Sequence, residues 1–244
     1  MSPKSVIVSP TQKDIDKARE IFGILISIYG TPEWREPLSA VDELVSTVLS
    51  QNTNDTNRDR AYNNLRAKLP TWESVRDAPA EEVIEAVRVA GLANQKGPRI
   101  QSVLRQISAE REDLSLDFLR DKRKNEALGW LKQHKGVGPK TAAIVLQFSL
   151  GIPAFPVDTH VYRVSGRTGI RPDKLNVERT HVWMEQLFDP KQYGPGHLNF
   201  IKFGREICHA RKPECPICPI NHLCDYFKNL PDKEPDRKIV NYPA

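Results

Sequence analysis

The sequence predicts an all-α protein. Apolar residues recur at three-to-four spacing in one segment after another, which is the period of an amphipathic helix. No segment shows the sustained alternation of apolar and polar residues that is typical of a half-buried strand. Prolines and glycines fall between the helical segments, where they favour short connections between packed helices.

The helical pattern begins at residues 17–30 and recurs along the chain as far as residue 188. Its later segments are 40–51, 80–92, 100–110, 125–134, 141–150, 160–170 and 181–188. Breaks between helices are predicted at Pro32, Pro37, Pro70, Pro79, Gly97-Pro98, Gly151 with Pro153, and Pro172. After Cys224 the chain becomes polar and proline-bearing, so we expect residues 226–244 to be loosely ordered.

The composition is that of a globular protein with a small basic excess. Hydrophobic residues make up 39% and charged residues 27%, and the net charge of +5 mildly favours a polyanionic partner. The apolar stretches are shorter than the ~20 residues that span a membrane, and the N-terminus lacks a signal-peptide pattern. We therefore expect an intracellular protein, in the cytoplasm or nucleoid, with no membrane partner.

All four cysteines lie in one short segment. In a reducing compartment such crowding favours a metal site over disulfides, and thiolate sulfur suits zinc or an iron–sulfur cluster. Only one pair is closely spaced and the other gaps are wide, which favours a bulkier cluster but leaves a structural zinc site open. The candidate ligands are Cys208, Cys215, Cys218 and Cys224.

The loop between the first two cysteines is basic, with Arg211 and Lys212 in it. An ordered basic loop can neutralise the phosphates of a nucleic acid without recognising its sequence. A solvated basic turn is the alternative.

The stretch HKGVGPKTAAIVLQF at residues 134–148 predicts a hairpin of two helices. One helix covers about 125–133, a tight turn follows at Gly136-Val137-Gly138, and the next helix begins near Lys140. Glycines permit positive φ and leave the backbone amides uncovered, so the turn and the following helix start can bind a phosphate. An ordinary helix-ending turn with a surface lysine is the alternative.

Asp158 precedes the helical pattern of residues 160–170 and is expected to cap it. In a segment that returns toward the preceding helix, its carboxylate can also face Lys140 across a cleft. A lysine partly removed from water is a competent nucleophile, and a nearby carboxylate can take up protons and stabilise a cationic sugar. The sequence therefore favours one pocket for both groups.

Three stretches together resemble the endonuclease III family of helix-hairpin-helix DNA glycosylases that carry a [4Fe-4S] cluster. They are the hairpin ending in Lys140, PVDTHVYRV at 156–164, and CHARKPECPICPINHLC at 208–224, and the likeness extends from about residue 30 to Cys224. The resemblance implies that Lys140 is a Schiff-base nucleophile, that Asp158 is its carboxylate partner, and that the four cysteines bind the [4Fe-4S] cluster.

The same resemblance implies contacts with DNA. In LSQNTND at 49–55, Asn52 stands where the family has a glutamine that fills the space left by an extruded nucleotide, and in AGLANQK at 90–96 Leu92 stands as an apolar wedge. Unstacking a base costs a few kcal/mol, which inserted side chains partly offset. Taken alone, Leu92 is more simply a core leucine and Asn52 a helix-end cap. The expected DNA-binding residues are Gln51, Asn52, Leu92, Gly136, Val137, Gly138, His160, Arg211 and Lys212.

The resemblance further implies a two-lobed fold. Residues 34–152 would form a six-helix barrel that includes the hairpin, and residues 1–33 with 153–244 would form an iron–sulfur cluster domain. Lys140 and Asp158 would face each other at the mouth of the cleft between the lobes.

The implied function is base excision repair by a monomeric, bifunctional DNA glycosylase and AP lyase. It would remove oxidised pyrimidines from duplex DNA and cut the strand 3′ to the lesion by β-elimination. The chain departs from the family pattern at His134-Lys135, at Pro139 and at Asn52, which bears on substrate choice. A glycosylase for mismatched thymine or 5-methylcytosine, and a non-catalytic duplex-binding module, are the alternatives.

Overall fold

The prediction of an all-α fold is confirmed. The computed structural model describes residues 9–32, 36–111 and 113–231, and within them every regular element is helical and none is a strand. The chain divides into two compact units, one formed by Trp34–Pro153 and the other by Met1–Glu33 together with Ala154–Ala244. None of the described helices has the length and apolar character needed to cross a membrane.

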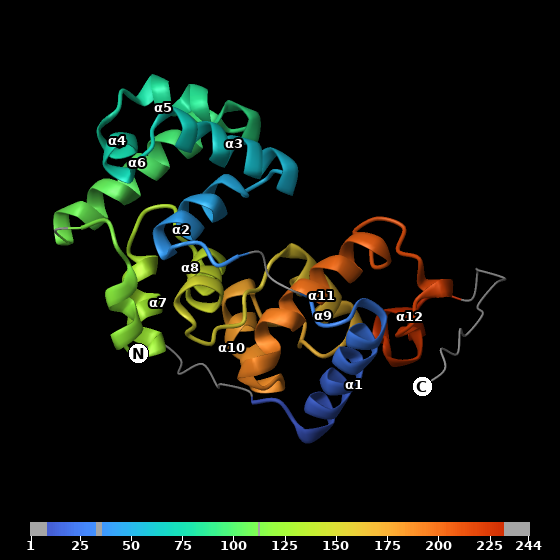
Figure 1. Cartoon of the computed structure of the whole chain (residues 1–244). Coiled ribbons are helices and arrows are strands. Elements are labelled where there is room, and N and C mark those ends of the chain that lie inside the picture. The colour runs from blue at the N-terminus through green and yellow to red at the C-terminus, as the bar shows by residue number, and fades with distance from the viewer. Residues whose placement is uncertain (1–8, 33–35, 112, 232–244) are drawn as a thin grey trace, which may run out of the picture. The chain divides into compact units, whose positions relative to one another are not determined.

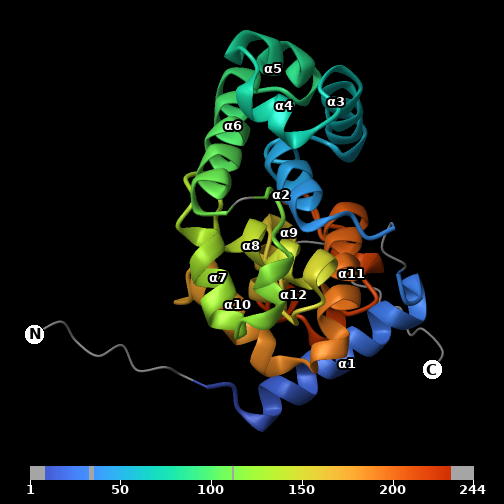
Figure 2. The same ribbon diagram turned by 60° about the vertical axis from the view of Figure 1, so that its left-hand side comes forward.

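The Trp34–Pro153 unit is built around α2, a helix buried on almost every side. Its buried residues include polar ones such as Glu43, Ser46 and Thr47, and α2 packs against α3, α6 and α8. Helices α3 to α6 gather together in both Figure 1 and Figure 2. The α-helices of this unit are α2 (Ala40–Leu49), α3 (Asp55–Lys68), α4 (Trp72–Asp77), α5 (Ala80–Ala86), α6 (Ala93–Glu110), α7 (Lys124–Lys132) and α8 (Pro139–Val145).

Short helical turns complete this unit. The 3₁₀ turns lie at Arg88–Ala90 and Asp117–Asp121, and a π-helical turn at Leu146–Leu150 directly continues α8.

Helix α6 runs through the Gly97-Pro98 pair, so the predicted break between helices at this point is wrong. Gly97 is buried against α5, where an added Cβ would lie 3.0 Å from Ile84 Cγ1. The absence of a side chain at Gly97 therefore permits the close packing of two helices, and Pro98 is accommodated inside the helix.

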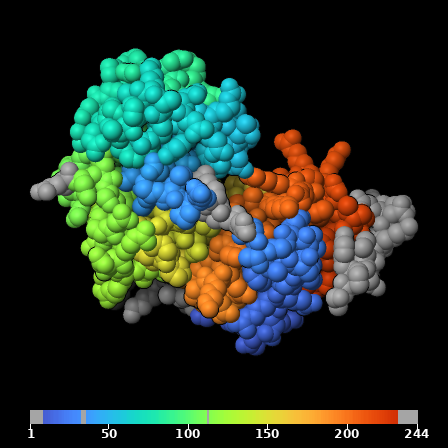
Figure 3. Space-filling view, viewed as in Figure 1, coloured from blue at the N-terminus to red at the C-terminus, as the bar shows by residue number. Residues whose placement is uncertain are grey.

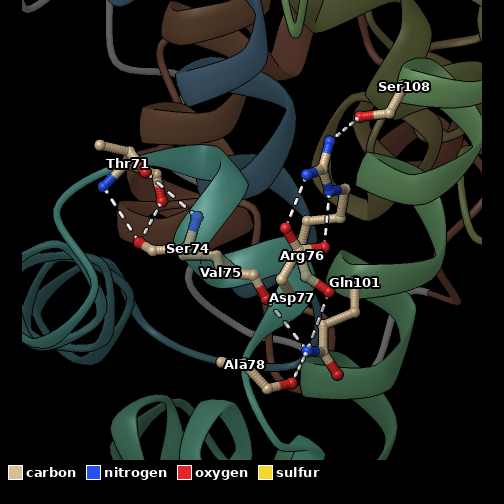
Figure 4. Close-up of polar contacts among 8 residues, drawn as sticks. All are labelled: Thr71, Ser74, Val75, Arg76, Asp77, Ala78, Gln101 and Ser108. Carbon is tan, nitrogen blue, oxygen red and sulfur yellow. Dashed lines mark hydrogen bonds and ion pairs between the residues drawn. The ribbon is translucent and has the colours of Figure 1, made fainter.

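Figure 4 shows how α4 is fixed to α6. The Gln101 side chain is 1% exposed, and its Nε2 donates to the carbonyl oxygens of Val75 at 3.0 Å and Ala78 at 2.8 Å. Two turns further along α6, Ser108 Oγ accepts a hydrogen bond from Arg76 Nη1 at 2.8 Å. Carbonyls at the end of a helix have no hydrogen-bond donor within it. The buried amide of Gln101 therefore supplies a donor to carbonyls at the end of the six-residue α4.

The second unit has an aromatic core. The rings of Phe155 and Phe188 stack with centroids 5.5 Å apart, and Tyr193 and Phe200 each pack edge-on against this pair. Helix α11 packs on α9, and α1 packs on α10 and α11. The helices are α1 (Gln12–Tyr29), α9 (Thr159–Thr168), α10 (Val177–Leu187), α11 (Tyr193–Glu206) and α12 (Asp225–Lys228).

The first and last helices of this unit meet at an ion pair. Lys17 Nζ of α1 lies 2.7 Å from Asp225 Oδ1 of α12, beside Gly169, where an added Cβ would lie 1.7 Å from Asp225 Oδ2. The expectation of loose order over residues 226–244 is therefore wrong at its start, because α12 is a packed helix as far as Lys228. Residues 232–244 of that tail lie outside the described residues.

Substitution of Gln101 by leucine tests the link between α4 and α6. Gln101→Leu keeps the volume but leaves buried carbonyls without a donor, so we expect a loss of about 2 kcal/mol in the free energy of unfolding. Urea denaturation measures it. Gln95→Leu, at an exposed position of the same helix, is the control and should change stability by less than about 0.5 kcal/mol. Equal effects at both positions would contradict the capping role.

Candidate functional site

The hairpin forms as the sequence predicts, between α7 and α8. Val137 N donates to His134 O at 3.0 Å, which closes the turn, and Val137 is buried. Only Gly136 uses the freedom expected of both glycines, with φ of 96°. Gly138 has φ of −89°, caps α8 and is exposed, with no atom within 4 Å of an added Cβ. Its bare backbone can therefore be approached closely by a partner.

Lys140 lies in the first turn of α8, two residues after the capping glycine. Its side chain is half-buried, and within its own unit the described residues offer its amine no hydrogen bond or ion pair. The helix start leaves the first amides without intrahelical acceptors. The hairpin thus places a primary amine beside a set of backbone donors.

Asp158 caps α9, as predicted: its Oδ1 accepts from Val161 N at 2.8 Å. The carboxylate is half-buried. The extended segment that leads to it is held by buried histidines, because His181 Nδ1 and His197 Nδ1 lie 2.9 Å from the carbonyl oxygens of Phe155 and Pro156. Asp158 and Lys140 belong to different units, and the expectation that they face each other stays a prediction.

His160 is half-buried in the first turn of α9 rather than projecting freely. Its Nδ1 lies 3.0 Å from Arg163 Nη2, and its ring packs against Gly204 of α11. Burial lowers the pKa of His160, against the opposing pull of the Asp158 carboxylate. The ring is therefore predominantly neutral near pH 7.

Asn52 and Leu92 share an uncommon backbone conformation. Their φ values are 54° and 51°, and both residues are exposed. Leu92 is 48% exposed at the start of α6, so the simple assignment to the core is wrong. Asn52 is not a cap either, because Asn54 caps α3. An exposed leucine held in a left-handed conformation is the arrangement expected of a wedge, although its insertion into DNA stays a prediction.

Two residues that the sequence did not single out lie beneath these loops. Lys96 is buried and its Nζ donates to the carbonyl oxygens of Leu49 and Ala90. Arg99 Nη1 donates to Gln51 Oε1 at 2.7 Å. Nothing in the local sequence distinguishes them from solvated basic residues, because Leu49 and Gln51 lie 47 and 48 residues away along the chain.

The four cysteines line one cavity in the second unit, together with apolar side chains such as Phe203, Ile207 and Ile220. None of the four forms a disulfide. No three His, Cys, Asp or Glu side chains among the described residues are gathered closely enough for a single metal ion. The thiols instead surround a shared space.

The chemistry of this cavity fits a cationic metal centre. Burial, together with the charges of the other three cysteines, raises the pKa of the Cys218 thiol to about 12. Burial likewise raises the pKa of Cys224. Four thiolates around one cavity are stabilised by positive charge between them, which an iron–sulfur core supplies.

Helix α9 holds the segment that carries these cysteines. Arg163 Nε donates to Cys208 O at 3.0 Å, and Arg167 donates to His209 O at 2.6 Å and Ala210 O at 3.0 Å. Arg167 Nη1 also lies 3.4 Å from Cys208 Sγ. The helix that begins at Asp158 is therefore bonded directly to the cysteine segment.

The basic loop between the first two cysteines is at the surface, in the orange-red region of Figure 3. Arg211 and Lys212 are both exposed, and Lys212 has φ of 51°. Since Arg167 binds the carbonyls just before them, these charges extend from a fixed loop.

Comparison with known proteins defines the class. Residues 45–188, more than half of the chain, match the family model of the HhH-GPD superfamily base excision DNA repair proteins, and residues 208–224 match the iron-sulfur binding domain of endonuclease III. The second match begins at Cys208 and ends at Cys224, so the protein carries a [4Fe-4S] cluster domain and the zinc alternative is set aside.

Individual relatives narrow the assignment. Endonuclease III of Rickettsia conorii is 35% identical over 189 residues, which cover 77% of this chain and 84% of that protein. At3g47830 of Arabidopsis thaliana is 38% identical over 151 residues, 62% of this chain, and the match spans 52% of that relative's length. A solved non-covalent endonuclease III–DNA complex superposes with a TM-score of 0.76 at 27% identity, covering 88% of this chain and 96% of that one. The chain belongs to the endonuclease III family.

Substitution of the hairpin glycines separates their roles. In Gly136→Ala the new Cβ would lie 2.2 Å from Arg99 Cδ at a φ of 96°, so we expect a loss of about 2 kcal/mol in the free energy of unfolding. Gly138→Ala meets nothing and should lose less than about 1 kcal/mol, the cost of a poorer cap. Thermal unfolding compares them, and equal losses would contradict this account.

The stability of the hairpin should depend on pH through His134. This residue is 2% exposed, and burial lowers its pKa from the ordinary value of 6.5. Between its lowered folded pKa and 6.5 the unfolded chain binds more protons, so the folded state loses stability as pH falls below about 6.5, by at most about 1.4 kcal/mol per pH unit.

The variant His134→Leu lacks this titration. The free energy of unfolding of the wild type minus that of the variant should decrease as pH is lowered from 7 to 5. The titration of His160 contributes equally to both proteins and does not change this difference. Parallel stability curves over this range would contradict the assignment.

Proposed function

We propose that this protein is a bifunctional DNA glycosylase and AP lyase that removes oxidised pyrimidines from duplex DNA. The observation that carries the proposal is Lys140, a half-buried primary amine in the first turn of the helix that follows the glycine hairpin. A lysine so placed is suited to nucleophilic attack on a sugar whose phosphate is bound by adjacent backbone amides.

In the proposed reaction the damaged nucleotide is extruded from the duplex and Lys140 Nζ attacks C1′. The bond between C1′ and the base breaks, and the base leaves with the electron pair and a proton. Loss of the amine proton and opening of the sugar ring give a Schiff base between Nζ and C1′. Abstraction of a C2′ proton then expels the 3′ phosphate, which cuts the strand 3′ to the lesion by β-elimination.

Asp158 is proposed to stabilise the cationic sugar and to transfer protons in these steps. Its Oδ1 is occupied by the amide of Val161, so the orientation of the carboxylate is fixed while its other oxygen is available to substrate. Because Asp158 caps α9, the same hydrogen bond serves both the helix and the reaction.

DNA binding is proposed to use both units. Asn52 would fill the space left by the extruded nucleotide and Leu92 would part the neighbouring bases. The amides of the 136–138 turn would hold a phosphate, and Arg211 and Lys212 would neutralise others. We propose the protein acts as a monomer.

Cys208, Cys215, Cys218 and Cys224 are proposed as the cluster ligands. The cluster, when bound, supplies a rigid cationic crosslink, and no step of the reaction is assigned to it. It would fix the basic loop and, through Arg163 and Arg167, the helix that begins at Asp158.

Borohydride trapping tests the proposal. The protein is incubated with duplex containing thymine glycol, and separately with duplex containing an abasic site, and covalent adducts are resolved on a denaturing gel. Wild type should form an adduct on both, because reduction fixes the Schiff base, and Lys140→Gln should form neither. Lys122→Gln, at an exposed lysine of the same unit outside the hairpin, should behave as wild type.

Each other outcome has a definite meaning. An adduct on abasic duplex alone would keep the lyase and redirect the substrate search to mismatched thymine or 5-methylcytosine. No adduct on either duplex would overturn the proposed reaction in favour of a duplex-binding protein.

A further inference from the structure

Two basic side chains one turn apart on α6, Lys96 and Arg99, contact three segments that the proposed function brings to DNA. These are the segment after α2 that contains Asn52 (residues 50–54, the plug loop), the segment around Leu92 (residues 90–92, the wedge loop), and the hairpin (residues 134–138). All of them belong to the Trp34–Pro153 unit.

Lys96 joins the end of α2, directly before the plug loop, to the wedge loop. Its side chain is 1% exposed, and its Nζ donates to Leu49 O at 2.7 Å and to Ala90 O at 2.8 Å. Leu49 ends α2 and Ala90 ends a 3₁₀ turn, so both carbonyls lie where a helix carries partial negative charge. A single ammonium thus caps two helical elements at the points where the two loops begin.

Arg99 joins the plug loop to the hairpin. Its Nη1 donates to Gln51 Oε1 at 2.7 Å. The aliphatic part of the same side chain lies over Gly136, where an added Cβ would be 2.2 Å from Arg99 Cδ and 2.5 Å from Cγ. Any side chain at position 136 would displace Arg99, and with it the contact to Gln51.

The loops held by this pair are strained. Asn52 and Leu92 both have positive φ, which is unfavourable for residues with a side chain and is most costly for one without a local polar contact. Such conformations persist only where the surroundings fix them. Lys96 and Arg99 supply that constraint from the interior side of the loops, and the strained residues Asn52 and Leu92 are exposed to solvent.

We propose that Lys96 and Arg99 are positioning residues that hold the plug loop, the wedge loop and the hairpin in their DNA-binding geometry before DNA arrives. The inference rests on the proposed function, since it assigns a purpose to loops that the glycosylase reaction would use. It also divides the roles of two neighbours: Gln51 anchors the plug loop through Arg99, and Asn52 is the residue presented to DNA.

The test is a comparison of two reactions in the full-length, cluster-containing protein. Arg99→Met removes the guanidinium but keeps the aliphatic part over Gly136. Base excision from duplex requires extrusion, so its single-turnover rate should fall about ten-fold in the variant. Strand cleavage at a preformed abasic site, where there is no base to extrude, should change by less than about two-fold.

Arg105→Met is the matched control, because Arg105 is exposed on the same helix two turns away. It should leave both rates within about two-fold of wild type. A merely structural role for Arg99 would slow both reactions together, and that result, or no change in either, would overturn the proposal.

A double substitution tests the contact itself. Gln51→Leu and Arg99→Met each break the same hydrogen bond, so the excision rate of the double variant should equal that of the slower single variant. Multiplicative losses would show that the two residues act independently and would overturn the anchoring role of Gln51.

Hydrogen exchange of the free protein separates this inference from the proposed function. In Arg99→Met the amides of residues 50–54 and 134–138 should exchange faster, while those of α4 and α5 should not change. If wild type excises no base at all, the glycosylase proposal fails and exchange alone decides: faster exchange confined to these loops supports the positioning role, and unchanged exchange overturns it.

Discussion

A buried ammonium group is the interaction on which the Trp34–Pro153 unit depends. Removing a charge from water is costly, so Lys96 is stable in the core only while the carbonyls of Leu49 and Ala90 both stay within reach. Burial lowers the pKa of Lys96, which is the measure of that cost. The ends of α2 and of the Arg88–Ala90 turn are therefore fixed relative to each other. The plug loop and the wedge loop, which begin at these ends, are positioned by the same contacts.

The second unit uses guanidinium groups for a comparable purpose. Arg163 and Arg167 lie one turn apart on α9 and bind consecutive carbonyls of the cysteine segment. The cysteines in turn surround a cavity in which burial raises the pKa of Cys218 and Cys224, so a cationic centre would favour their thiolate forms. Asp158 begins the same helix, so the cluster segment and the carboxylate share one rigid element. A cluster without any part in the chemistry would still influence the reaction through this helix.

The features that could be predicted from the sequence are those set by neighbours along the chain. The hairpin, the Asp158 cap and the cysteine segment each follow from residues only a few positions apart. Helix α3 was not predicted because Ala61 and Leu65 are its only buried residues, and α11 because it contains Gly194-Pro195-Gly196.

Long-range constraints could not be predicted in this way. Lys96 lies 47 residues from Leu49, and an isolated lysine gives no sign that it is buried. The apolar character of Leu92 suggested the core, but the tight turn of backbone at the start of α6 turns it outward at 48% exposure. Rigid support of this kind matters to the proposed reaction, because extruding a base costs a few kcal/mol and ordering a mobile loop would add to that cost. Under the proposed function, the strain of the loops is met during folding, so the free energy of DNA binding remains for unstacking the base. Asn52, which the resemblance places at the family's glutamine position, would then insert a shorter side chain from a loop that stays fixed.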